Sequence, residues 1–231
     1  MKLAIMQPYF LPYVGYFQLI RAVDCFVLYD NIKYTKKGWI NRNRMLVNGD
    51  DSMFTVPLQS DPDTFDVAQR TISAEFNKVK FLNRFRESYR GASNFAAVWP
   101  LLERIVMNEH TSLMRYIHEA IVAVCDWLGI DTRIVLSSTI NIDHALHGRD
   151  KVLAICQTLG ADHYLNAIGG KELYDRDDFR SHGIELSFLQ SDYIEYSQFN
   201  HPFVPWLSII DVMMFNTADD IGPMLSMWKA V

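Results

Sequence analysis

The two ends of the chain share a pattern in which short apolar runs alternate with segments of helical spacing. Residues 2–6 form an aliphatic run that stops at Gln7-Pro8, and because proline cannot continue a central strand, the run predicts a strand that ends there. Apolar residues recur every third position over 13–23, which predicts a helix. The unbroken apolar run 25–29 predicts a second strand, buried on both faces.

The middle third of the chain has a mostly helical pattern. A polar and aromatic stretch, 32–49, shows no regular period, and 53–58 predicts one strand. Helical spacing then covers three segments: 74–89, 95–107 and 111–128. Gly129 suits the C-cap of the last helix. We therefore predict a helical insertion over about residues 74–130.

The strand and helix alternation returns in the last hundred residues. Strands are predicted at 132–136, 163–165 and 185–189, helices at 150–159 and 171–181, and a C-terminal helical tail at about 203–231 with helices at 206–215 and 218–229. Strands separated by helices pair in parallel through right-handed crossovers, so both ends of the chain contribute to one sheet. The sequence thus predicts a single α/β domain over 1–231, a parallel sheet flanked by helices with a mainly helical insertion.

Composition narrows the class of protein. Hydrophobic residues make up 49% of the chain and charged residues 21%, which is typical of a folded globular protein. The net charge of −5 argues against a nucleic-acid partner. The three cysteines form no CxxC pair, which favours a reducing compartment. The apolar run at the N-terminus is too short for the hydrophobic region of a signal peptide. No apolar run approaches the ~18 residues of a membrane span, so we expect a cytoplasmic protein.

Polar residues follow the predicted strands where ligands bind in open parallel sheets. Such ligands lie beyond the carboxyl ends of the strands, where loops and helix N-termini converge. Gln7, Asp30 and Asn166 occupy these positions, and we expect them at one edge of the sheet. Gln7 and Asp30 are therefore candidates for catalysis, and Asn166 for substrate binding.

The segment 7–16 is stiff and aromatic where a loop enters a helix. Tyr9, Tyr13 and Tyr16 suit stacking on a base or sugar, and Gly15 would let a ligand approach the first helical turn. The alternative is that the tyrosines hold the helix to the core.

A cationic cluster follows the second predicted strand. Its members lie within twelve residues: Lys33, Lys36, Lys37, Arg42 and Arg44. Arginine forks and lysine point charges both suit phosphate, so we predict phosphate binding by Lys36, Lys37 and Arg42, beside Trp39 and Asn41. A solvated loop, with Trp39 packed in the core, is the alternative.

Two glycines separate a predicted strand from a helix in the segment 166–171. Gly169, Gly170 and Lys171 have the layout in which backbone N–H groups hold an oxyanion. The segment lacks the GxxxxGK[ST] pattern of a P-loop, so ordinary turn glycines are an equal alternative.

Among the remaining polar residues, His201 beside Pro202 is the best candidate for proton transfer. His144 and His147 have no third ligand, so no metal site is predicted. Asp211 lies on an otherwise apolar helical face and needs a partner, for which we expect a buried ion pair.

Four stretches resemble the WbqC family: 6–17, 34–44, 169–171 and 207–211. The resemblance covers nearly the whole chain. Family members are associated with gene clusters for bacterial O-antigen (lipopolysaccharide) and other surface polysaccharides. The resemblance implies a protein that builds or decorates a nucleotide-activated sugar.

A second resemblance concerns the start of the first helix. Tyr13-Val14-Gly15-Tyr16 occupies the place of the HxGH element in nucleotidyltransferases and pantothenate-synthetase-like ligases. The resemblance implies a Rossmann-like fold of the nucleotidyltransferase or HUP type. Both histidines are tyrosines here, and a neutral phenol can only donate a hydrogen bond to the phosphates, so the fold carries over better than the mechanism.

The leading hypothesis is acyl or aminoacyl transfer to the amino group of a nucleotide-linked amino sugar, with ATP and Mg²⁺ as candidate cofactors for an acyl-adenylate route. Gln7 and Asn166 would orient the reacting group, and Asp30 or His201 would move the proton. The alternatives are a nucleotidyl or glycosyl transferase, or a non-catalytic nucleotide-sugar binding protein. The expected partners are the nucleotide-linked sugar and the acyl donor, and a homodimer is one option for assembly.

Overall fold

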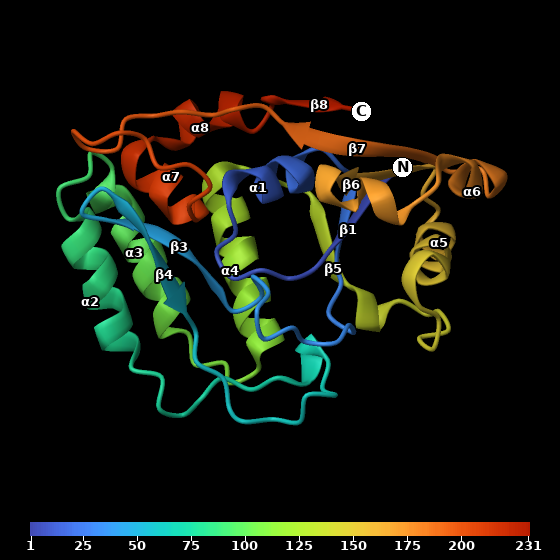
Figure 1. Ribbon diagram of the computed structural model, residues 1–231, viewed down its shortest axis with the longest axis horizontal. Coiled ribbons are helices and arrows are strands. Elements are labelled where there is room, and N and C mark those ends of the chain that lie inside the picture. The colour runs from blue at the N-terminus through green and yellow to red at the C-terminus, as the bar shows by residue number, and fades with distance from the viewer.

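A six-stranded sheet in the order β5-β2-β1-β6-β7-β8 forms the centre of the computed structural model, which describes residues 1–231 (Figure 1). Its strands are β1 (Lys2–Met6), β2 (Cys25–Leu28), β5 (Arg133–Leu136), β6 (His163–Ala167), β7 (Glu185–Ser191) and β8 (Trp228–Ala230). The first five are parallel to one another, and β8 is antiparallel to β7. The predicted α/β fold of Rossmann-like class is confirmed.

Side chains alternate between the two faces of the sheet, which builds two cores. Leu3 and Ile5 point to one face, which α5 (Gly148–Leu159) and α6 (Arg176–Ser181) cover. Ala4 and Phe26 point to the other. The helices of the second core are α1 (Val14–Arg21), α2 (Lys78–Tyr89), α3 (Phe95–Met107), α4 (Leu113–Leu128), α7 (Ile209–Phe215) and α8 (Ala218–Met224).

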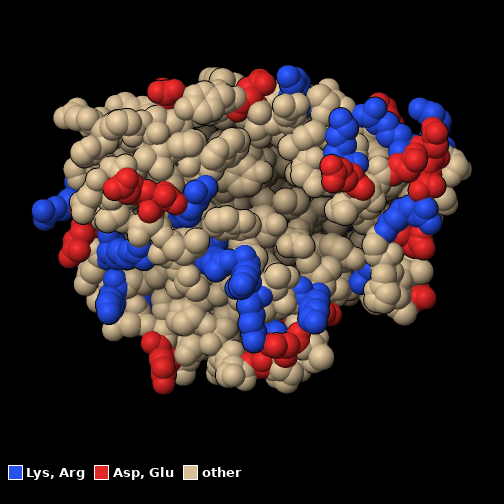
Figure 2. Space-filling model, in the orientation of Figure 1, with Lys and Arg blue, Asp and Glu red and all other residues tan.

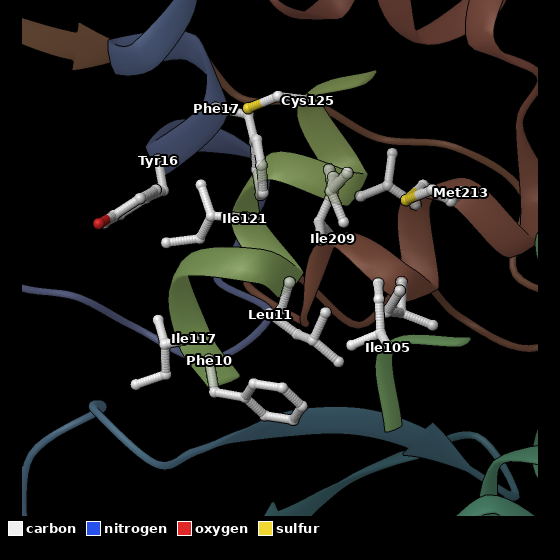
Figure 3. Close-up of a cluster of buried hydrophobic side chains, with 14 of the residues drawn as sticks. Phe10, Leu11, Tyr16, Phe17, Ile105, Ile117, Ile121, Cys125, Ile209 and Met213 are labelled. Atoms are coloured by element: carbon white, nitrogen blue, oxygen red, sulfur yellow. The ribbon is translucent and has the colours of Figure 1, made fainter. Parts of the chain in front are cut away.

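The larger core also anchors the loop between β1 and α1. Phe10 and Leu11 of this loop are buried among Ile117 and Ile121 of α4 and Ile209 of α7 (Figure 3). Burying a side chain of this size stabilises the fold by about 1.5–3 kcal/mol. The loop that leaves the end of β1 is thus fixed by packing.

A β-hairpin, β3 (Arg42–Val47) and β4 (Asp50–Thr55), occupies much of the stretch for which no regular structure was predicted. Its turn is Asn48-Gly49, with φ of 53° and 89°, which is typical of a two-residue hairpin turn. The strand predicted at 53–58 corresponds to β4, which begins and ends three residues earlier.

The three predicted helices of the insertion are confirmed. They are α2 (Lys78–Tyr89), α3 (Phe95–Met107) and α4. The first begins later than predicted because the Asn77 side chain caps it, accepting a hydrogen bond from Lys80 N at 2.8 Å. Gly129 ends α4, as the sequence predicted, and Gly160 ends α5 directly after the predicted helix 150–159; both glycines have the left-handed conformation.

Two segments near the C-terminus differ from the predicted helices. The helix predicted over 171–181 is a 3₁₀ segment, η3 (Ile168–Leu173), followed by α6. The helix predicted over 218–229 ends at Met224, and β8 follows it. Pairing with β7 stabilises β8, which local sequence cannot reveal. No helix combines the length and apolar character needed to cross a membrane.

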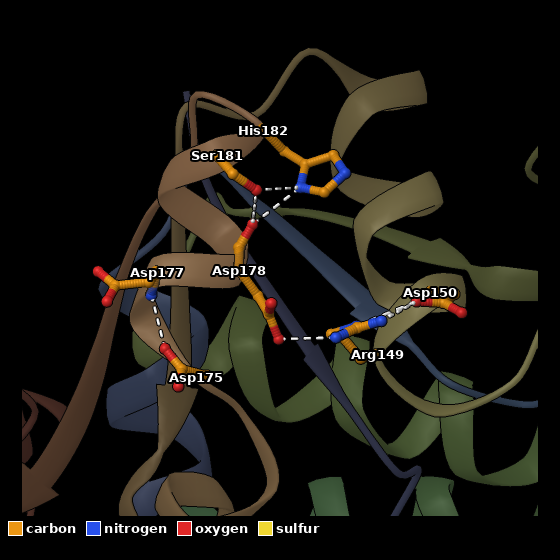
Figure 4. A network of polar contacts seen from close by, with 7 residues as sticks. All are labelled: Arg149, Asp150, Asp175, Asp177, Asp178, Ser181 and His182. Atoms are coloured by element: carbon orange, nitrogen blue, oxygen red, sulfur yellow. Dashed lines mark hydrogen bonds and ion pairs between the residues drawn. The ribbon is translucent and has the colours of Figure 1, made fainter.

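Charged side chains join α5 to α6 at one end of the molecule (Figure 4). Arg149 lies 2.7 Å from Asp178 and 3.0 Å from Asp150. All three side chains are largely exposed, and such pairs contribute only about 0–1 kcal/mol. We assign this network to the surface of the fold and not to a ligand site.

Asp211 is buried in α7, and its partners are not the basic residue that we expected. Its carboxylate accepts hydrogen bonds from Tyr89 Oη at 2.7 Å, Tyr196 Oη at 2.6 Å and Gln198 Nε2 at 2.7 Å. Tyr89 also accepts from Leu46 N at 2.8 Å. Neutral donors thus satisfy this carboxylate and tie α2, α7 and the hairpin together.

Candidate functional site

The chain order reverses between β1 and β6, because β1 leads to β2 and β5 while β6 leads to β7. Ligands in open α/β sheets bind beyond the carboxyl ends of the strands at such a point. Gln7 follows β1 here, and Asn166 lies near the end of β6. Figure 2 shows a hollow at the centre of this face, in the region that α1 and η3 flank in Figure 1.

The loop after β1 is held in a strained conformation at this edge. Leu11 has a φ of 47°, a left-handed conformation that costs an ordinary residue about 1–2 kcal/mol. Its carbonyl accepts hydrogen bonds from Asn43 Nδ2 at 2.9 Å and Ser208 Oγ at 2.8 Å. Phe10 N donates to Ile40 O at 2.9 Å. Strain that is held by surrounding contacts is common at ligand sites.

An aromatic pocket of about 230 Å³ opens beside this loop. Its lining residues are Tyr9, Tyr13, Trp39, Asn43, Arg44 and Trp206. The rings of Tyr13 and Trp206 meet edge to face, with centroids 6.1 Å apart. Like Leu11, Trp206 has a left-handed backbone conformation, with a φ of 62°, and its ring lines the pocket. We use the name aromatic pocket for these six residues.

Arg44 places a fixed positive charge in the wall of the aromatic pocket. Its guanidinium lies 5.7 Å from the centre of the Trp39 ring. Nη1 contacts Asp51 at 3.2 Å, and Nη2 donates to Trp206 O at 3.2 Å. Nε is buried and has no hydrogen-bond partner. The pocket therefore combines aromatic faces with a cation, as a nucleotide or nucleotide sugar requires.

Several predicted residues of the first loop come together here. Tyr9 and Tyr13 line the aromatic pocket, and burial raises the pKa of both phenols, which keeps them protonated donors. Tyr9 Oη donates to Gln7 Oε1 at 3.4 Å, so the exposed Gln7 side chain lies next to the pocket.

The contacts of Tyr16 and Gly15 support the fold of the loop and the start of α1. Tyr16 is 1% exposed, and its hydroxyl donates to Gln7 O at 2.9 Å. A Cβ atom on Gly15 would lie 2.4 Å from the Tyr13 ring and 2.8 Å from Ser191 Oγ. Gly15 thus permits the close approach of Tyr13 to the first turn of α1.

A second cavity, of about 310 Å³, is lined by two further members of the cationic cluster. Lys36, Asn41 and Arg42 line it, and we call it the basic cavity. Arg42 Nε donates to Gly38 O at 2.7 Å, and its Nη2 donates to the carbonyl of the exposed Lys37. The Arg42 guanidinium lies 6.0 Å from the Trp39 ring, on which Arg44 of the aromatic pocket also lies. The two cavities are therefore neighbours at Trp39.

Asp30 is buried just after β2, and both of its carboxylate oxygens accept hydrogen bonds. Its carboxylate accepts from Ser137 Oγ at 2.8 Å, Ser138 N at 2.9 Å and Ser138 Oγ at 2.6 Å. These bonds tie β2 to η2 (Ser137–Thr139), the segment that follows β5. Asp30 lines neither of the two cavities.

The glycine segment lies at the end of β6 and in η3. Gly170 is needed because a Cβ atom there would lie 2.2 Å from Asn166 Nδ2. Asn166 Oδ1 accepts from Ala167 N at 2.8 Å. Gly169 and Lys171 are exposed. None of these residues lines the aromatic pocket or the basic cavity.

His201 lies away from the other candidate residues. Its exposed ring packs on the hairpin turn, 3.1 Å from the position of a Cβ atom on Gly49. Gly49 is five residues from Arg44 along the hairpin, which is about 16 Å of extended chain.

A larger hollow, of about 600 Å³, lies at the amino ends of β6 and β7, between Asp162, Arg176 and Glu185. We favour the aromatic pocket over this open groove because parallel sheets bind ligands at their carboxyl ends. No group of three or more His, Cys, Asp or Glu side chains is placed to hold a metal ion.

Several residues of these cavities were not expected from the sequence, among them Trp206 and Arg70. Trp206 comes from the segment before α7, and Arg70 of the basic cavity follows η1 (Val67–Gln69). Neither has a local motif, and only the fold brings them to the hairpin. The Asn48-Gly49 turn would have revealed the hairpin itself.

Comparison with known proteins agrees with the resemblance to the WbqC family. The WbqC-like protein family matches residues 7–222. The "Uncharacterized protein Rv1507c" of Mycobacterium tuberculosis is 31% identical over 218 residues, which make up 93% of each chain. No solved structure matches. The chain belongs to the WbqC-like protein family.

Proposed function

We propose that this protein binds a nucleotide-linked amino sugar in the aromatic pocket and transfers an acyl or aminoacyl group to its amino nitrogen, in the biosynthesis of a bacterial surface polysaccharide. The observation that carries the proposal is the aromatic pocket itself. Four aromatic rings and the Arg44 guanidinium surround about 230 Å³ next to Gln7. Aromatic faces suit a base or sugar ring, and a guanidinium suits a phosphate.

The proposed reaction uses ATP with Mg²⁺ to activate a carboxylic acid. The acid attacks the α-phosphate, which forms an acyl-adenylate and releases pyrophosphate. The amino nitrogen of the sugar then attacks the acyl carbon and an amide bond forms. The bond from the acyl carbon to the AMP oxygen breaks, and the nitrogen loses its proton to solvent water. Gln7, next to the aromatic pocket, orients the reacting group, and Lys36, Lys37 and Arg42 hold phosphates.

The test is a transfer assay read by mass spectrometry. Purified protein is incubated with ATP, Mg²⁺, a panel of carboxylic and amino acids, and UDP-, dTDP- and GDP-linked amino sugars. We expect one nucleotide sugar to gain the mass of an acyl group while AMP appears. Absence of any ATP-dependent or donor-dependent mass change across the panel would contradict the proposal.

A second candidate function is non-catalytic binding of a nucleotide sugar for a partner enzyme. The placement of the two proton-transfer candidates favours it. Asp30 is occupied by Ser137 and Ser138, and His201 lies at the hairpin turn. Thermal stabilisation by a nucleotide sugar without turnover, together with a copurifying transferase, would support this function over catalysis.

A further inference from the structure

Arg70 is a buried cation whose donors are largely unused. The residue is 3% exposed, and its Nε and Nη2 atoms are buried without a hydrogen-bond partner. Nη1 makes one contact, donating to Asp61 O at 3.2 Å. No carboxylate lies within ion-pair distance of this guanidinium. The fold therefore leaves most N–H donors of this permanently charged guanidinium without a hydrogen-bond partner.

Such an arrangement is unfavourable in the absence of a ligand. Buried polar groups are nearly always hydrogen-bonded, and a buried cation without a counter-ion is strongly disfavoured. The rings of Tyr34, at 4.7 Å, and Phe65, at 6.0 Å, cover the guanidinium and offset part of this cost. Ring contacts act on the face of the guanidinium, so they do not satisfy the donors in its plane.

The charges around Arg70 define what the basic cavity attracts. Lys36, Arg42, Arg70 and Asp61 are its charged lining residues, three cations and one carboxylate. Lys36 is exposed and pairs with Asp63 at 2.8 Å at the rim. Arg42 donates only to backbone carbonyls. Three cations against the carboxylates of Asp61 and, at the rim, Asp63 leave one net positive charge, which favours an anionic ligand.

We propose that the basic cavity is a phosphoryl-binding site in which Arg70 is the buried anchor. A guanidinium fork binds phosphate oxygens with two parallel hydrogen bonds, for which the free Nε and Nη2 donors are the natural pair. The cavity adjoins the aromatic pocket at Trp39. The assignment of this phosphoryl group to the diphosphate of a nucleotide sugar rests on the proposed function, and the site does not depend on the transfer reaction.

The test uses inorganic pyrophosphate as the probe and thermal unfolding as the readout. Wild-type protein is titrated with pyrophosphate and, separately, with potassium chloride of equal ionic strength. We expect the Tm to rise with pyrophosphate alone. Arg70→Met should weaken pyrophosphate binding at least about tenfold, while Arg70→Lys should retain part of it. Arg104→Gln, at an exposed position of α3, is the matched control and should bind like wild type.

A second readout separates a ligand anchor from a structural arginine. Because its charge is uncompensated, Arg70→Met without ligand should be as stable as wild type or more stable. A large fall in Tm would assign Arg70 to the fold and overturn the proposal. Lys36→Met, at an exposed position, gives an independent check and should weaken pyrophosphate binding several-fold.

The outcomes for the two proposals are distinct. No pyrophosphate-dependent shift in wild type, or an equal shift in Arg70→Met, would overturn the phosphoryl site. A specific shift that Arg70→Met abolishes, combined with no acyl transfer, would uphold the site and contradict the proposed enzymatic function.

Discussion

Asp211 and Arg70 are both buried charged residues, and their surroundings differ in kind. Asp211 is 0% exposed and accepts three hydrogen bonds, from two tyrosines and a glutamine. Arg70 is 3% exposed and makes one hydrogen bond, to a carbonyl. The chain itself supplies hydrogen-bond partners for the Asp211 carboxylate, but it leaves most donors of Arg70 without partners.

The contrast separates architecture from ligand binding. A satisfied buried polar group stabilises a particular arrangement of elements, because removal of one partner leaves the others unpaired. An unsatisfied one destabilises the free protein and is tolerated where a ligand completes it. Asp30 belongs with Asp211 by this criterion, whereas Arg70 and the Nε atom of Arg44 form the opposite group.

Asp211→Ala should cause the greatest loss of stability among the variants considered. The change leaves the hydroxyls of Tyr89 and Tyr196 and the Gln198 amide unpaired in the core, and we expect the free energy of unfolding to fall by about 4 kcal/mol. Urea denaturation measures it, with the exposed Asp131→Ala as control. If Arg70→Met destabilised the protein as much, the distinction between the two residues would be lost.

Asp30→Asn tests whether the second satisfied carboxylate is structural. The amide keeps one acceptor but loses the charge that Ser137 and Ser138 donate to, so we expect a loss of about 2 kcal/mol. Binding of pyrophosphate should not change. Full stability together with a complete loss of acyl transfer would instead identify Asp30 as a catalytic residue.

Trp39→Ala acts on the ligand side of the comparison. The ring is 41% exposed and lies beside the guanidinium groups of Arg42 and Arg44, so its removal should lower the free energy of unfolding by about 1 kcal/mol. Loss of a stacking face should weaken binding of a nucleotide sugar about tenfold, measured by isothermal titration calorimetry. Val79→Ala, on the exposed side of α2, is the control. Unchanged affinity in Trp39→Ala would remove the aromatic pocket from the proposed function.

A smaller effect concerns pH. Burial raises the pKa of Asp211 above its usual 3.8, so the native state holds this proton more tightly than the unfolded chain does. The stabilisation from protonation is full below about pH 3.8 and is lost as the pH rises through the native pKa. Asp211→Asn has no such group, so the advantage of wild type over this variant should shrink with rising pH in urea denaturation. An advantage that grows with pH would show that the three donors lower the pKa instead.

The sequence was informative about elements and partly informative about the site. Tyr9, Tyr13 and Trp39 were selected from one stiff loop and one cationic stretch, and they line one pocket. Asp30 and Asn166 were expected at the same edge of the sheet as Gln7. They lie at the carboxyl ends of β2 and β6, but neither lines the aromatic pocket or the basic cavity. Strand ends identify the edge of a sheet, but they do not specify the direction in which a side chain turns.

The amino-acid sequence alone determined the alternation of strands and helices, the helix ends at Gly129 and Gly160, and the candidate loop after β1, because apolar period and glycine conformation act over a few neighbouring residues. The tertiary structure decided the pairing of β8, the entry of Trp206 into the aromatic pocket and the missing partners of Arg70. These features depend on contacts between segments distant in the chain, and whether a buried charge is satisfied is a property of everything that surrounds it.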